Sequence, residues 1–264
     1  MVVYFIKDAF MNYKFLSGNA LKLIAAVSML LDHIGILFFP FNGIFRIFGR
    51  LALPLFAFMI AESAKYTRNK KRHFFTMFSL AVVCQIVYYF FDSGSLYMCI
   101  LVTFSISTLL IYALQNFKRV LFSKNADTFD KVLSGAIFFG GILATFVLNS
   151  LITIDYGFIG CILPVTVSLF DFKDIDAPEK YKKLDRLEYK LICFAVPLVA
   201  LIISNMMRQV FIIPYTQMFS LLSIPLLLLY SGKRGTPKLK YFFYIFYPVH
   251  LALLEGIVML SRLL

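Results

Sequence analysis

The stretch Met29–Arg50, MLLDHIGILFFPFNGIFRIFGR, decides how this chain must fold. Nearly every side chain in it is apolar, yet it also carries Asp32, His33, Arg46 and Arg50. At the centre of a bilayer a charged side chain costs roughly 3 kcal/mol, so an apolar segment rarely carries one without a use for it. The two arginines are four residues apart and share one helix face. We therefore expect the function of the protein to depend on this stretch.

The composition around this stretch is that of a membrane protein. The chain has 264 residues, of which 61% are hydrophobic, and its mean hydropathy is +0.83, whereas soluble domains are about half apolar. Apolar runs of about 18 or more residues alternate with charged clusters, which is typical of helices that cross a bilayer. The alternating pattern of a β-barrel is missing from the sequence. The sequence predicts a single all-α, polytopic domain over residues 1–264, with about nine transmembrane helices.

The limits of the apolar runs predict where these helices lie. The sixth is short and contains Pro164, so we expect it to be tilted, broken or re-entrant. The nine predicted segments cover residues 19–39, 44–64, 74–91, 95–117, 132–154, 157–170, 191–209, 212–231 and 242–261.

The net charge of +12 is distributed in a way that orients the chain. Lys and Arg gather in alternate connections between the apolar runs, which is the pattern of cytoplasmic loops and argues against nucleic acid as a partner. The pattern predicts a cytoplasmic N-terminus and an external C-terminus. All but four of the 26 basic residues then fall on the cytoplasmic side, the exceptions being Arg46, Arg50, Arg208 and Arg262.

Two polar parts of the chain lie outside the predicted spans. Residues 1–18 mix aromatic, aliphatic and charged side chains and are expected to form an interfacial amphipathic helix, with Ser17 as a cap for the first span. Residues 171–190 form a charged cytoplasmic connection that could fold as a surface helix. The four cysteines form no CxxC pair, so we expect neither a disulfide framework nor a metal site. No cleavable signal peptide is evident.

His33 is the strongest candidate for chemistry in the sequence. Imidazole is well suited to take up a proton near neutral pH, and a carboxylate precedes this residue. Asp32 could orient His33 or raise its basicity, although neighbouring residues of a helix point about 100° apart. Asp32 could instead pair with Arg46 or Arg50, so that buried charges neutralise one another. Gly35 offers room for the close approach of another segment.

The last predicted span carries polar or helix-breaking residues deep in an apolar run. This pattern indicates that the helix lines a cavity and does not face lipid alone. The residues are Tyr247, Pro248, His250 and Glu255.

Four further residues have simpler structural interpretations. Pro54 is expected to kink the second span. His73 follows three basic residues and is expected to be solvated. Glu62 is expected to form an interfacial ion pair, and Asp155 is expected to cap the helix that follows it.

Several separate motifs of this sequence resemble those of the TraX family. They lie in the same order over about residues 21–254, and they are LKLIAAVSMLLDHIG, GRLALPLFAFMIAE followed by TRNKKR, DYGFIG and KYFFYIFYPVHL. TraX proteins are associated with N-terminal acetylation of pilin, and the family is similar to membrane acyltransferases such as acyltransferase-3 proteins and heparan-alpha-glucosaminide acetyltransferase. The resemblance implies a multi-pass protein of a bacterial plasma membrane that takes acetyl-CoA from the cytoplasm.

The resemblance also implies roles for individual residues. His33 corresponds to the catalytic His of these enzymes and is predicted to act as a base or as an acetyl carrier. Arg46 and Arg50 match an arginine-bearing second helix, where either could stabilise an oxyanion, with Asp32 beside them. His250 matches a C-terminal Tyr-Pro-x-His motif. Acetyl-CoA, with no metal, is expected to be bound by Lys22, Lys65, Arg68, Lys71, Arg72, Tyr247 and His250.

The acceptor and the class of function stay open at this point. A peptide N-terminus, a glycan or a small amine could each accept the acetyl group at the outer side. A transporter or flippase with a polar pathway through the membrane is one alternative. A non-catalytic assembly subunit, in which the buried charges only lock helices together, is another. Membrane lipid is an expected partner in every case.

Overall fold

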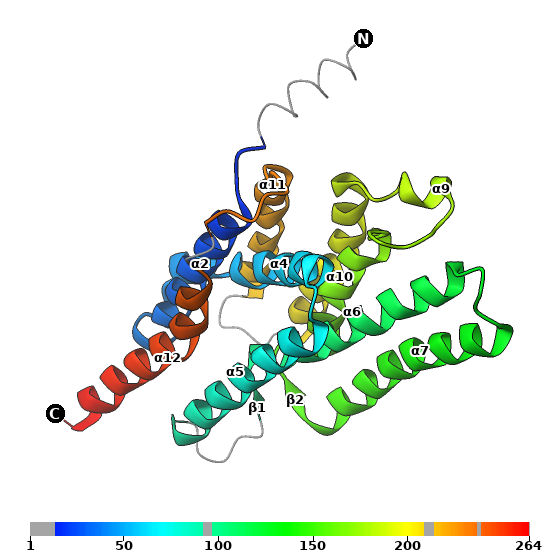
Figure 1. The fold of residues 1–264 in the computed structure, drawn as a ribbon. Helices are drawn as coiled ribbons and strands as arrows, with labels where there is room; N and C mark the ends of the chain where they lie inside the picture. The colour runs from blue at the N-terminus through cyan, green and yellow to red at the C-terminus, as the bar shows by residue number, and fades with distance from the viewer. Residues whose placement is uncertain (1–13, 92–96, 209–213, 237–238, 264) are drawn as a thin grey trace, which may run out of the picture.

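The computed structural model describes residues 14–91, 97–208, 214–236 and 239–263. Within these ranges the chain is a bundle of helices with one very small sheet (Figure 1). Seven of the described helical segments are long and apolar enough to cross a membrane, which confirms the prediction of an all-α polytopic membrane protein. Most of the interfacial helix expected over residues 1–18 falls on residues 1–13, outside the described residues.

Each of the nine predicted segments corresponds to helix in the structure. The long ones are α2 (Gly18–Phe38), α3 (Gly43–Gly49) with α4 (Ala52–Tyr66), α5 (Lys70–Phe91), α6 (Ile100–Phe122), α7 (Thr128–Leu151), α10 (Leu187–Arg208) and α12 (Leu239–Leu263). The two shorter ones are α8 (Gly157–Val167) with the 3-10 helix η1 (Ser168–Phe170), and the 3-10 helix η2 (Pro214–Leu222) with α11 (Ser223–Leu228). The predicted sixth segment is therefore short, as expected.

Polar side chains before the apolar runs fix the starts of several helices. Ser17 Oγ accepts a hydrogen bond from the backbone N–H of Ala20 (3.2 Å) at the start of α2, which confirms the predicted cap. Asn42 caps α3 by accepting from the N–H of Ile44 (3.0 Å), and Asp127 caps α7. These contacts satisfy N–H groups that the start of a helix leaves without an intrahelical partner.

The second predicted span is broken into two helices. α3 ends at Gly49 and α4 begins at Ala52, so Arg50 lies in the turn between them. Pro54 has no N–H to donate to the Arg50 carbonyl four residues earlier, which interrupts the hydrogen-bond ladder of the helix at this point. The expected effect of Pro54 on this span is confirmed.

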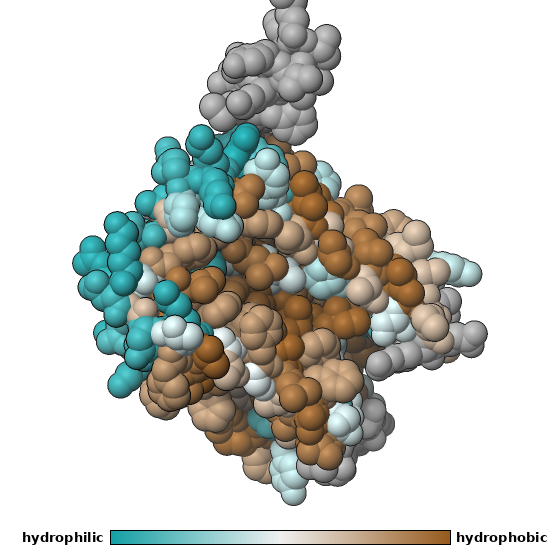
Figure 2. Space-filling model, turned by 90° about the vertical axis from the view of Figure 1, so that its right-hand side faces the viewer, coloured by the Kyte–Doolittle hydropathy of each residue, from teal (hydrophilic) through white to brown (hydrophobic). Residues whose placement is uncertain are grey.

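α6 is a central helix of the described bundle and packs against α4, α5, α7 and α8. The apolar core around it includes Phe58, Ile111, Leu163 and Phe194, which are all buried. α5 and α7 expose many apolar side chains on their outer faces. Figure 2 shows hydrophilic residues gathered at one edge of the molecule and hydrophobic residues over most of the remaining surface of that face. This distribution suits a molecule whose sides contact lipid.

Two connections complete the described fold. A two-residue parallel pairing of β1 (Tyr97–Met98) with β2 (Thr153–Ile154) ties the start of α6 to the end of α7. In the charged connection of residues 171–190 only α9 (Glu179–Lys182) and the first residues of α10 are helical. The surface helix considered for this connection is therefore wrong for most of it. The start of α2 and the end of α12 lie at opposite ends of the molecule (Figure 1), as an odd number of spans requires.

Candidate functional site

A cavity of about 1530 Å³ follows α2 through much of the molecule. α2 contributes lining residues from Gly18 at its start to Leu37 near its end, and its 21 residues correspond to a length of about 30 Å. Lys22 and Arg72 line the cavity on the side predicted to be cytoplasmic, and Asn149 lines it on the side predicted to be external. The cavity is thus lined from both sides of the membrane.

Asp32 holds both arginines of the opening stretch in one ion cluster. Its Oδ1 lies 2.6 Å from Arg50 Nη2, and its Oδ2 lies 3.3 Å from Arg46 Nη1. The side chain of Arg50 is only 2% exposed and also donates to Gln217 Oε1 (3.1 Å). Removing one partner of such a buried pair is costly because it leaves a buried charge uncompensated. Of the two alternatives for Asp32, the structure has the pairing with the arginines.

Two glycines let the segments of this cluster approach one another. A Cβ at Gly49 would overlap the Asp32 carboxylate, and a Cβ at Gly35 would lie 2.7 Å from the Cβ of Phe45. Real Cβ atoms essentially never approach so closely, so the backbones would have to move apart. The expected close approach at Gly35 is confirmed, with α3 as the neighbouring segment.

His33 lies in the cavity wall, and its hydrogen bonding leaves one ring nitrogen available. Its Nδ1 lies 2.9 Å from the carbonyl oxygen of Met29. A carbonyl only accepts hydrogen bonds, so Nδ1 carries the proton, and in the neutral ring Nε2 holds a lone pair. His33 also lines the cavity. The ring can therefore take up a proton from a group bound there.

His250 packs against His33 from α12. The two ring centroids lie 5.1 Å apart, and Nδ1 of His250 donates to the carbonyl of Phe246 (2.8 Å). Nε2 of His250 is buried and has no hydrogen-bond partner among the described residues. His250 is not among the residues that line the cavity, so the structure places it behind His33 and not at the predicted donor site.

Some of the other residues predicted to bind the donor line the cavity, and others do not. Lys65 does not line this cavity and pairs instead with Asp171 and Asp185. Lys71 is exposed and lies outside the cavity wall. Arg234, which the sequence did not single out, is part of the wall. The predicted donor residues that do line the cavity are Lys22, Arg68, Arg72 and Tyr247.

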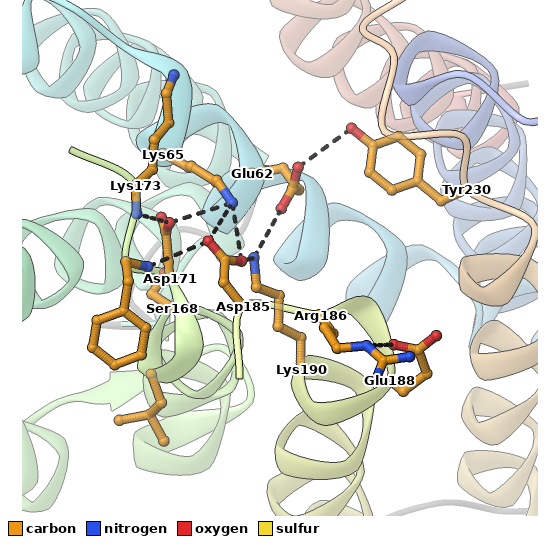
Figure 3. Close-up of polar contacts among 12 residues, drawn as sticks. Glu62, Lys65, Ser168, Asp171, Lys173, Asp185, Arg186, Glu188, Lys190 and Tyr230 are labelled. Carbon is orange, nitrogen blue, oxygen red and sulfur yellow. Dashed lines mark hydrogen bonds and ion pairs between the residues drawn. The ribbon is translucent and has the colours of Figure 1, made fainter. Parts of the chain in front are cut away.

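Lys65 belongs to a buried ion network on the predicted cytoplasmic side (Figure 3). Its Nζ lies 3.3 Å from Asp171 Oδ1 and 3.2 Å from Asp185 Oδ1, and Lys190 Nζ lies 2.7 Å from the same Asp185 oxygen. Burial opposes the charged form of Asp185, but Lys190 and Lys65 outweigh it and hold the pKa of this carboxyl below its ordinary value. The network fastens the charged connection to α4 and α10.

Glu62 extends this network toward the cavity. Its Oε1 lies 4.0 Å from Lys190 Nζ, and its Oε2 accepts a hydrogen bond from Tyr230 Oη (3.4 Å). Glu62 and Tyr230 both line the cavity. The expected ion pair of Glu62 is confirmed, with Lys190 as its partner.

Asp155 has a different role from the predicted helix cap. The N-cap residue of α8 is Tyr156, which makes no side-chain cap, while Asp155 Oδ1 accepts a hydrogen bond from Tyr97 Oη (2.5 Å). Burial raises the pKa of Asp155 to about 6, although the Tyr97 hydrogen bond and the charge of Arg50 act to lower it. Tyr97 was missed in the sequence because only the pairing of β1 with β2 brings it to Asp155.

His73 also differs from its prediction. It is not simply solvated, because its Nε2 lies 3.0 Å from Ser63 Oγ and its Nδ1 lies 2.7 Å from Tyr112 Oη. The ring also lines the cavity. The first turn of α5 therefore packs between α4 and α6, even though it follows a basic run. Gln217, the partner of Arg50, was missed as well, since 167 residues separate the two in the sequence.

Comparison with known proteins found a matching family and a similar curated protein. The family model described as TraX protein matches residues 17–258. The chain is also similar to the probable fimbrial assembly protein FimC, serogroup H1, of Dichelobacter nodosus, with 26% identity over 255 residues that cover 90% of this chain and 94% of the relative. No solved structure matches the chain. The chain therefore belongs to the TraX family of multi-pass membrane proteins.

Proposed function

We propose that this protein is an integral-membrane acetyltransferase that moves an acetyl group from cytoplasmic acetyl-CoA to an amine or hydroxyl at the outer side. The observation that carries the proposal is the position of His33, with an unprotonated Nε2, in the wall of a cavity that follows the whole of α2. Such a cavity lets a donor and an acceptor approach one base from opposite sides of the membrane.

The donor end of the cavity is the basic one. Lys22, Arg68, Arg72 and Arg234 line it on the predicted cytoplasmic side, and clustered cations suit the phosphates of a nucleotide. The pantetheine arm of the donor is long and thin, so it extends along the apolar part of the cavity toward His33.

The residues around His33 supply the chemistry of acyl transfer. His33 Nε2 removes a proton from the acceptor as the acceptor nitrogen or oxygen bonds to the thioester carbonyl carbon. The carbon–sulfur bond then breaks, and the proton held by His33 goes to the departing thiolate. Arg46 lines the cavity, in contact with Asp32, and stabilises the negative charge that develops on the carbonyl oxygen.

A protein subunit of a surface appendage is the acceptor we favour. Similarity to a probable fimbrial assembly protein over 94% of the relative's length supports this choice. A long cavity that is lined from the outer side as well suits an acceptor delivered after export.

Substitution of His33 by alanine tests the proposal. Acetyl transfer by the purified protein should fall at least about a hundredfold, because a positioned general base contributes about that much or more. Melting temperature in detergent serves as the folding control. Transfer at the normal rate by a well-folded His33→Ala variant would show that His33 is not the base.

A transporter could use the same cavity, and a non-catalytic assembly subunit would fit the name of the relative equally well. Acetyl-CoA should raise the melting temperature of the wild-type protein while acetate does not, since only the acetyltransferase has a site for the nucleotide of the donor. If acetyl-CoA does not change the melting temperature but the protein is still required for assembly of a surface appendage, the role of a non-catalytic assembly subunit is supported instead.

A further inference from the structure

A second cavity, of about 480 Å³, lies beside the first on the predicted cytoplasmic side. It is an open pocket lined by the end of α4, the start of α5, one face of α6 and the first residues of the charged connection, and Arg68, Arg119 and Lys173 in its wall are exposed. Tyr66, Thr67 and Arg68 line both cavities, so the two share a wall. The charged residues that line the second cavity are Lys65, Arg68, Lys70, Arg119, Lys173, Asp171 and Asp174.

These charges leave a surplus of cations in the second cavity. Lys65 is offset by Asp171, 3.3 Å away. The other four cations of the cavity form no ion pair with a carboxylate in the part of the chain that the structure describes. The ammonium groups of Lys70 and Lys173 lie over the rings of Tyr112 and Tyr66, at 5.1 and 4.3 Å from the ring centroids. Tyrosine rings hold a cation in place without neutralising it.

Gln115 adds an independent sign that the second cavity receives a polar ligand. Gln115 is only 9% exposed and lines this cavity. Its side-chain amide makes no hydrogen bond to another described residue. The amide is accessible from the cavity, so it can bond water or a ligand there. Gln115 and Arg119 lie four residues apart on α6 and therefore share one helix face, so an amide donor stands beside a guanidinium.

The positive-inside pattern accounts for cations in the loops but not for this arrangement. The pattern concerns cations such as Arg119 in the last turn of α6, whereas Gln115 carries no charge and lines the same pocket one turn earlier. We propose that the second cavity binds a phosphate group, held by Arg119, Lys70, Lys173 and Arg68 with Gln115 as a neutral donor. Guanidinium and ammonium groups around a phosphate form short, charge-assisted hydrogen bonds.

This phosphate can come from either of two sources. One is the nucleotide end of the acyl donor, in which case the shared wall at Arg68 directs the rest of the donor into the main cavity; this version rests on the proposed acetyltransferase function. The other is the headgroup of an anionic lipid of the cytoplasmic leaflet, which basic pockets between membrane helices can recognise. The chemistry at the cavity is the same for both.

Arg119→Gln and Lys70→Gln test the site, because neither residue lines the main cavity. Lys124→Gln is the matched control, since Lys124 is an exposed cytoplasmic lysine that lines neither cavity. The purified full-length protein is titrated with CoA, with dephospho-CoA, which lacks the 3′-phosphate, and with phosphatidylglycerol in mixed micelles. Binding is read as affinity and as the shift in melting temperature, and unliganded melting temperatures report folding.

If the donor supplies the phosphate, both variants should bind CoA about tenfold more weakly and lose the wild-type preference for CoA over dephospho-CoA. If lipid supplies it, CoA binding is unchanged while stabilisation by phosphatidylglycerol is lost. If both variants respond to the ligands as Lys124→Gln does, the proposal that the second cavity binds phosphate is wrong. Absence of CoA binding in the wild type would contradict the proposed function alone, because the lipid titration still decides whether the second cavity binds phosphate.

Discussion

At the scale of single residues, the Asp32 carboxylate determines the geometry of the site. Both of its oxygens contact guanidinium groups, so Asp32 does not also hold the His33 ring. That ring is oriented by the Met29 carbonyl one turn earlier in α2. The helix itself therefore selects the tautomer that exposes Nε2, and Asp32 acts on His33 only through its charge and through the arginines.

Gly49→Ala should damage this cluster without removing any charged group. Its Cβ would overlap the Asp32 carboxylate, and overpacking of this kind costs about 1–3 kcal/mol. We expect a lower melting temperature and a loss of acetyl transfer, because the contact between Asp32 and Arg50 must lengthen. Both are measured on the purified protein in detergent.

Gly140→Ala is the control for this substitution. A Cβ at Gly140 meets nothing within 4 Å, and alanine is favoured over glycine inside a helix by about 0.5–1 kcal/mol. This variant should be as stable as the wild type or slightly more so, with normal activity. Equal behaviour of the two variants would show that the close packing at Gly49 is not needed.

At the scale of elements, two irregular parts of the chain position the site. The break between α3 and α4 lies at Arg50, which sits in the turn beside α2 and contacts Asp32 there. The charged connection between η1 and α10 contains only the short helix α9 and is fastened to the bundle by the network around Lys65. Both features depend on particular residues more than on helix propensity.

The network predicts a pH dependence of stability. The pKa of Asp185 is lower in the folded protein than its ordinary value of 3.8, so its contribution is complete above about pH 4 and is lost as the pH falls through the folded-state pKa. Melting temperature should therefore decrease in acid, and this component should be absent from Asp185→Asn. At neutral pH the variant should be less stable by about 1–3 kcal/mol, since it loses hydrogen bonds between charged groups.

Glu188→Gln provides the comparison for Asp185. Glu188 pairs with Arg186 at 3.5 Å, but both side chains are about half exposed, and Figure 3 shows this pair apart from the buried network. Exposed pairs contribute about 0–1 kcal/mol. If Glu188→Gln and Asp185→Asn lowered the melting temperature equally, the buried network would have no special role.

At the scale of the whole molecule, the proposed function depends on access from both sides of the membrane. Lys22, Arg68, Arg72 and Arg234 of the cavity wall lie on the predicted cytoplasmic side, and the end of α7 with β2 lies on the other. A cavity lined from both ends serves a donor and an acceptor that never share a compartment. The orientation itself follows from the distribution of Lys and Arg.

Single cysteines at the two ends of α7 test this orientation. Asn125 precedes the helix and Ser150 lies near its end, and both residues are exposed. In intact cells a membrane-impermeant thiol reagent should label Ser150→Cys, whereas Asn125→Cys should react only after permeabilisation. Cys84, Cys99 and Cys161 are buried and Cys193 is partly exposed, so labelling of the unsubstituted protein gives the background. The opposite labelling pattern would invert the topology.

Much of the candidate site could be predicted from the sequence because charge is rare in its apolar segments. Asp32, His33, Arg46 and Arg50 stood out for this reason, and the structure brings the acid and both arginines into contact. The residues that were missed or misjudged, such as Gln217, Tyr97 and His73, make contacts that depend on helices far apart in the chain. Their sequence surroundings carry no unusual pattern.

The sequence by itself determined that this protein is a helical membrane protein and roughly where its spans lie, and it predicts which loops are cytoplasmic. These properties follow from local hydropathy and from charge counts, which do not depend on how the helices pack. Only the tertiary structure decided that Asp32 pairs with both arginines and that His250 lies against His33. Those outcomes depend on distances between helices. These distances are set by close contacts such as the one at Gly49 and by the interruption between α3 and α4 before Pro54.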